Sequence, residues 1–74
     1  MENNYISNFA VLILNIFYQL VEYGYVYPSD YDITAERFSR YISNIRFMMD
    51  EYHIYHMSIK YDRDNKRYML EKKN

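Results

Sequence analysis

The 74-residue sequence contains no cysteine, one glycine and one proline, and its first 36 residues contain no lysine or arginine. The lack of cysteine excludes disulfide bonds and thiol nucleophiles. A single glycine excludes a glycine-rich phosphate-binding loop. A signal peptide begins with a positively charged segment, which is missing here, so we expect a cytoplasmic protein.

The charges are divided unequally along the chain. The first 36 residues hold five acidic side chains, whereas residues 37–74 hold nine basic and five acidic ones, so charges of −5 and +4 add to the net charge of −1. Binding follows the local field rather than the net charge. Such an asymmetry indicates a nucleic-acid or acidic partner for the basic half.

The short length predicts a single domain over residues 1–74 with a small core. A domain of this size buries only about 60% of its unfolded surface, so additional stabilisation is expected. Disulfides are excluded, and two histidines are too few for a structural zinc site unless carboxylates join them. Self-association remains, and we expect a homodimer.

Apolar side chains at intervals of three and four predict a helix over residues 5–23, ended by Gly24 as a C-terminal cap. Val11, Leu12 and Leu14 lie off the main stripe, so a second face of this helix needs a partner. We expect a dimer interface made of apolar residues of this helix: Phe9, Leu12, Ile13, Ile16 and Phe17. Polar residues interrupt the run, which argues against a membrane span of about 20 apolar residues.

A second helical region is expected over residues 34–53, capped by Asp32 or Thr34. Its apolar stripe keeps helical phase from Phe38 to Tyr52. The opposite face carries polar and basic residues: Arg37, Arg40, Ser43, Asn44 and Arg46. This face is either the solvated side of an amphipathic helix or a binding surface. Every charge before Asp50 on this face is positive, which supports the second interpretation.

From residue 57 the apolar period becomes two, which predicts a β-hairpin over residues 57–71. Residues 25–27 favour a third strand. The hairpin tip and the adjoining strand positions carry basic side chains: Lys60, Arg63, Lys66 and Arg67. These contact phosphates or protect the sheet edge from aggregation. The expected fold class is α+β, with two long helical regions followed by a β-hairpin.

Little in the sequence supports catalysis. His53 and His56 follow Asp50 and Glu51, but the segment lies where helix passes into strand and the set of metal ligands is incomplete. No pair of carboxylates has an evident pocket, and a chain this short struggles to enclose a substrate. We therefore expect no enzyme, no cofactor and no metal.

Residues 33–40, the helical run to Tyr52 and the segment 59–70 together resemble the second half of a winged helix-turn-helix DNA-binding domain. The hairpin carries the likeness best, with Ile59 in one strand, a polar basic tip and Tyr68 in the return strand. The resemblance implies that the later part of the second helical region enters the major groove and that the wing touches phosphate or the minor groove.

The implied contacts follow the chemistry of the side chains. Arginine pairs with guanine and asparagine with adenine, so Arg40, Asn44 and Arg46 are candidates for base or phosphate contact. Such domains separate their two DNA-facing helices by a short turn, yet residues 38–52 contain neither glycine nor proline. Either a turn lies near residues 41–44, or the chain forms two antiparallel helices and a hairpin without a recognition helix.

We therefore expect a viral or mobile-element transcription regulator that binds duplex DNA as a homodimer, which doubles the phosphate contacts. The alternative is a protein-binding inhibitor of a host or defence enzyme, such as an anti-CRISPR-like protein. Its contact surface would combine exposed tyrosines with acidic residues: Tyr25, Tyr27, Tyr31, Tyr55, Asp30, Asp32 and Glu36. A viral origin would place the protein in the host cell cytoplasm.

Overall fold

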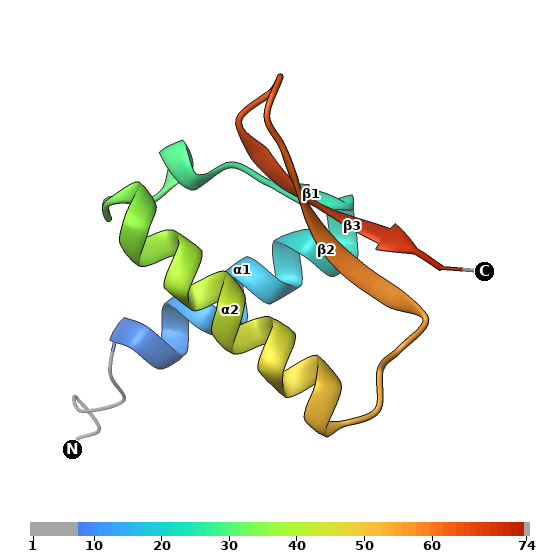
Figure 1. Cartoon of the computed structure of the whole chain (residues 1–74). Coiled ribbons are helices and arrows are strands. Elements are labelled where there is room, and N and C mark those ends of the chain that lie inside the picture. The colour runs from blue at the N-terminus through green and yellow to red at the C-terminus, as the bar shows by residue number, and fades with distance from the viewer. Residues whose placement is uncertain (1–7, 74) are drawn as a thin grey trace, which may run out of the picture.

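The computed structural model describes residues 8–73 and has an α+β fold. Its elements in chain order are α1 (Asn8–Tyr23), β1 (Tyr25–Val26), the 3-10 helix η1 (Pro28–Asp30), α2 (Ala35–Glu51), β2 (Met57–Asp62) and β3 (Arg67–Lys72). Figure 1 shows α1 and α2 crossing beside a three-stranded sheet, with the hairpin tip projecting past η1. The predicted fold class is confirmed.

Gly24 ends α1 and starts the sheet. Its φ of 86° is a left-handed conformation that side chains with a Cβ disfavour, and its N–H donates to the Leu20 carbonyl at 2.9 Å. The Gly24 carbonyl in turn accepts the Leu70 N–H at 2.9 Å. The helix end and the first sheet contact thus belong to one residue. The predicted residues 5–7 of this helix lie outside the described residues.

Helix α2 starts at a capping hydrogen bond and continues without a break. The Thr34 hydroxyl oxygen accepts the Arg37 N–H at 3.1 Å, so Thr34 rather than Asp32 is the N-cap. Between its ends the helix runs unbroken for 17 residues. The suggested turn near residues 41–44 is therefore wrong, because the apolar stripe keeps one phase and no residue there interrupts the backbone hydrogen bonds.

The sheet has the order β1-β3-β2, and both pairings are antiparallel. Val26 pairs with Tyr68, so the third strand expected from residues 25–27 is present, although it has only two residues. Ile59 pairs with Leu70 in the hairpin. This register places Ile59 in the core beside the helices, while Lys60 is exposed.

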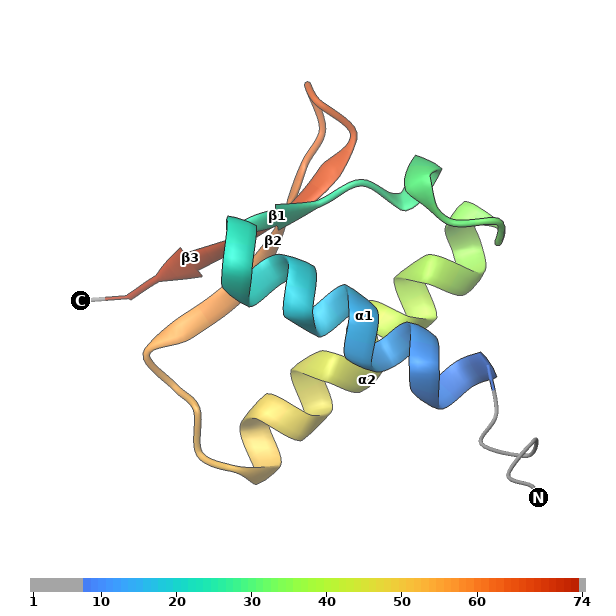
Figure 2. The same ribbon diagram turned by 180° about the vertical axis from the view of Figure 1, so that it is seen from behind.

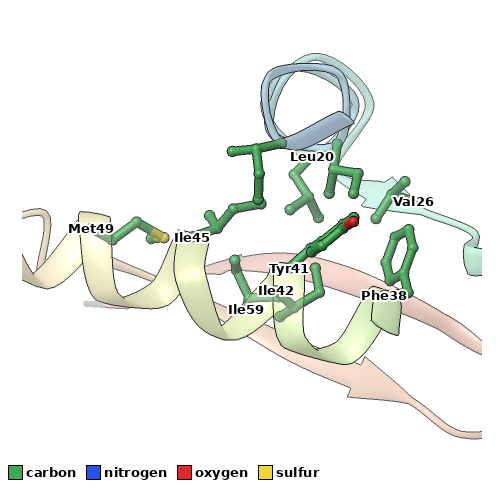
Figure 3. Close-up of a cluster of buried hydrophobic side chains, with 10 residues drawn as sticks. Leu20, Val26, Phe38, Tyr41, Ile42, Ile45, Met49 and Ile59 are labelled. Carbon is green, nitrogen blue, oxygen red and sulfur yellow. The ribbon is translucent and has the colours of Figure 1, made fainter. Parts of the chain in front are cut away.

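The core lies between the crossing helices and one face of the sheet, as Figures 2 and 3 show. The fully buried large side chains come from both helices: Phe38, Ile16, Leu20, Ile42 and Ile45. The sheet contributes Val26 and Ile59. Phe38 stacks on Tyr68 with ring centroids 5.6 Å apart, which joins the start of α2 to β3.

Candidate nucleic-acid interface

Three of the predicted binding residues come together on α2. Arg37, Arg40 and Asn44 are spaced by three and four residues, so they lie along one side of the helix. They line a shallow depression together with Phe9 and Tyr41, whose rings meet edge to face at a centroid distance of 5.1 Å. The cationic row is therefore bordered by an aromatic pair that joins α1 to α2.

The guanidinium groups of Arg37 and Arg40 are available for an external partner. Both residues are exposed, and within residues 8–73 neither side chain makes a hydrogen bond or an ion pair. Ser43 is also exposed, three residues after Arg40. An unpaired guanidinium with its donors in water suits recognition of phosphate or of a base edge, because no internal contact has to be broken.

Arg46 lies on a different side of α2 and has an internal role. Its Nη2 donates to the Ile59 carbonyl of β2 at 2.8 Å. Because β2 is an edge strand, this bond uses a backbone acceptor that a further strand would otherwise pair with. Arg46 thus connects α2 to the sheet edge and does not belong to the row formed by Arg37 and Arg40.

Two basic residues of the hairpin tip are free as well. Arg63 and Lys66 are exposed, and neither forms an ion pair with any residue that the structure describes. Lys66 borders a hollow whose other walls include Tyr31 and Ala35, at the start of α2. The tip and the first turn of α2 thus border the same hollow.

Arg67 and Lys60, by contrast, have partners within the sheet. Arg67 Nε donates to Asp62 Oδ2 at 3.1 Å, and its Cζ lies 4.7 Å from the centre of the Tyr25 ring. Lys60 Nζ lies 3.7 Å from Glu71 Oε1, and both groups are exposed, so this pair adds little stability. The side chains of Arg67 and Lys60, which we predicted to contact nucleic acid, are therefore engaged largely in contacts within the sheet.

Asp62 organises the hairpin tip. Its carboxylate accepts the Asn65 side-chain amide at 2.8 Å and the Arg67 Nε. The hydrogen bonds from Asn65, followed by those and the charge of Arg67, lower the pKa of Asp62 below its ordinary value of 3.8. The tip is therefore held in shape by a carboxylate that stays ionised at neutral pH.

The residues predicted for a dimer interface differ in exposure. Ile16 is fully buried and Ile13 is 7% exposed, so both serve the core. Leu12 and Phe17 are half-buried and pack against it. Phe9 is 45% exposed and contacts Tyr41. An interface on α1 has to use other side chains besides these.

The tyrosines of the alternative hypothesis make internal contacts. Tyr31 O–H donates to Asn15 Oδ1, and burial, with the nearby charge of Asp30, raises the pKa of Tyr31. Tyr27 lies beside Tyr25, and its hydroxyl accepts from Arg67. Tyr55 bonds to His53. Tyr25 and Tyr55 nevertheless remain 38% and 56% exposed, and binding to another protein stays a prediction.

In the part of the chain that the structure describes, no cluster of three or more histidine, cysteine, aspartate or glutamate side chains is arranged to hold a metal ion. None of the described helices has the length and apolar character needed to cross a membrane. Comparisons of the chain with protein-family models, curated proteins and solved structures found no match.

Proposed function

We propose that this protein is a small transcription regulator of the winged-helix type that binds duplex DNA. The observation that carries the proposal is the exposed row of Arg37, Arg40 and Asn44 on α2, whose two guanidinium groups have no partner among residues 8–73. Arginine supports bidentate pairing with guanine or phosphate, and asparagine supports pairing with adenine.

The order of elements before α2 supports a helix-turn-helix arrangement. The single turn η1 is followed by residues 31–34 and then by α2. A helix-turn-helix motif joins its two helices by a turn of about three to four residues and places the second helix in the major groove. Because α2 is unbroken, the expected recognition helix cannot begin after a turn within residues 38–52. In this proposal the break instead lies before Ala35, and the whole of α2 serves as the recognition helix.

Further charges fit the same orientation, although Glu36 in the first turn of α2 would oppose a phosphate there. The backbone N–H groups at the start of α2 form the positive end of a helix dipole, which favours phosphate nearby. Lys66 at the hairpin tip adds a cation beside the hollow that Ala35 also borders, and the exposed Arg63 adds a second cation at the tip. Asp50 and Glu51 lie at the opposite end of α2, where they would face away from the phosphates closest to the tip.

A pair of double variants tests this surface. Arg37→Ala with Arg40→Ala removes two cations of the proposed row, and we expect at least a 10-fold weaker affinity for duplex DNA. The salt slope of log K should also become shallower by roughly 2, because each lost phosphate contact removes about 0.9. Fluorescence anisotropy of a labelled duplex at several salt concentrations measures both quantities.

The matched control is Lys72→Ala with Lys73→Ala, which removes the same charge from the far end of β3. The control should keep an affinity within about threefold of the wild type and an almost unchanged slope. Equal losses in the two double variants would show that net charge alone governs binding, and the proposed surface would be wrong.

A further inference from the structure

Helix α1 has a second apolar face that nothing in the described chain covers. Its inward face buries Ile13, Ile16 and Leu20. On the opposite side Val11, Leu14, Tyr18 and Val21 are 54%, 69%, 54% and 55% exposed. These four residues, called here the outer seam, follow one another at intervals of three, four and three, the spacing of the contact positions in paired helices.

The outer seam continues into an apolar groove. Leu14 lines a groove of about 250 Å³ between α1 and the end of α2, and all the other side chains that line it are apolar or aromatic. Phe17 and Met48 lie along it, and Tyr52, 76% exposed, stands at its side. A continuous apolar surface of this kind marks an interaction site rather than scattered exposed side chains.

The spacing of the seam fits a second copy of the same helix. Intervals of three, four and three read the same in both directions, so an antiparallel copy centred at residue 16 places Val11 opposite Val21 and Leu14 opposite Tyr18. Each contact then occurs twice, as a two-fold symmetric interface requires. Tyr18 of the second copy comes to lie beside Leu14, at the edge of the groove.

The charges select the antiparallel direction. Glu22 is the only charged residue of α1. In a parallel pair the two Glu22 side chains would lie next to each other and repel. In the antiparallel pair they stand 12 residues apart along the axis, about 18 Å at 1.5 Å per residue, which exceeds the screening length of about 8 Å at physiological salt.

We infer that two copies of this chain associate through the outer seam of α1 in an antiparallel two-fold dimer, with Tyr18 of each copy covering the groove of the other. The inference uses none of the basic residues of the proposed function, so each stands or falls separately. It also supplies the additional apolar burial that a domain of this size needs.

Light scattering after size-exclusion chromatography tests the association. The wild type should elute at twice the 9.3 kDa of one chain, and Leu14→Glu should elute as a folded monomer, because it places a charge at the centre of the seam. Phe47→Glu is the matched control: Phe47 is 63% exposed on α2 but outside the seam and the groove, so this variant should remain a dimer. A wild type that is monomeric at about 100 µM would overturn the inference and leave the seam open to some other occupant. A dimeric Leu14→Glu would overturn it as well.

Cross-linking tests the direction and does not depend on the folding of Leu14→Glu. The chain has no cysteine, so single substitutions report one position each. A mixture of Val11→Cys and Val21→Cys should form a mixed disulfide under oxidation. Val11→Cys alone should not, because its two copies would stand about 15 Å apart along the axis, beyond the reach of a disulfide. A fast Val11–Val11 cross-link would contradict the antiparallel geometry.

Discussion

His53 occupies a backbone position that usually belongs to glycine. Its φ is 59°, and its N–H donates to the Asp50 carbonyl while the Ile54 N–H donates to the Met49 carbonyl. This pair of bonds is the Schellman ending of a helix. The sequence showed the ending of α1 because Gly24 marks it, but the ending of α2 carries no such mark.

Replacing His53 by glycine should therefore stabilise the protein. A residue with a Cβ in the left-handed conformation costs about 1–2 kcal/mol of folding free energy, which glycine avoids. The greater freedom of glycine in the unfolded chain offsets roughly 0.5–1 kcal/mol of this gain. We expect His53→Gly to raise Tm by roughly 2–8 °C, measured by thermal unfolding. Tyr55→Phe removes the bond to His53 without changing the backbone and should leave Tm almost unchanged. A lower Tm for His53→Gly would show that the imidazole contacts outweigh the backbone strain.

At the scale of the elements, the hairpin depends on the carboxylate of Asp62. Because its pKa is lowered in the folded state, the unfolded chain binds a proton more readily. The stabilisation is therefore fully present above the ordinary carboxyl pKa and is lost as the pH falls through the lower, folded value.

We expect Asp62→Asn to flatten the fall in stability as the pH drops below the ordinary carboxyl pKa of 3.8, as measured by urea unfolding at several pH values. Asp64→Asn is the control, since the neighbouring Asp64 makes no hydrogen bond or ion pair with the described residues. If the two variants show the same pH dependence as the wild type, the bonds from Asn65 and Arg67 do not hold the tip in solution.

The elements also show what sequence patterns can and cannot predict. Periodicity of apolar residues located both helices and the hairpin to within a few residues, because burial of one face determines that pattern. Side-chain contacts that depend on strand pairing or on helix crossing cannot be predicted from this periodicity. Arg46 meets the Ile59 carbonyl and Arg67 meets Tyr25 only because α2 crosses β2 and because β1 pairs with β3.

For the same reason the basic face predicted on α2 was too broad. A helical projection places Arg37, Arg40 and Arg46 all outside the apolar stripe, yet only tertiary packing decides which of them borders a neighbouring element. The structure leaves Arg37 and Arg40 in solvent and brings Phe9 beside them. The position of Phe9 could not be predicted, because it depends on the angle at which the two helices cross.

At the scale of the whole molecule, most of the free cations lie apart from the apolar surface, although Val11 of the outer seam and Arg37 line one hollow. The free cations lie on α2 and at the hairpin tip, whereas the outer seam lies on α1 and contains no charge. An association through α1 would leave the cations of the hairpin tip open, while Arg37 would lie next to the interface at Val11. Two copies would then present twice the number of phosphate contacts on one assembly.

The most direct test of the proposed function is the salt dependence of binding to a labelled random duplex, followed by fluorescence anisotropy. Four free cations, Arg37, Arg40, Arg63 and Lys66, predict a slope of log K against log salt of about −3.6 for each copy that engages. Affinity should then fall roughly 100-fold between 50 and 200 mM salt, and further if both copies bind. An absence of binding at 50 mM salt, or a slope shallower than about −1, would contradict the assignment of α2 and the hairpin tip as a DNA-binding surface.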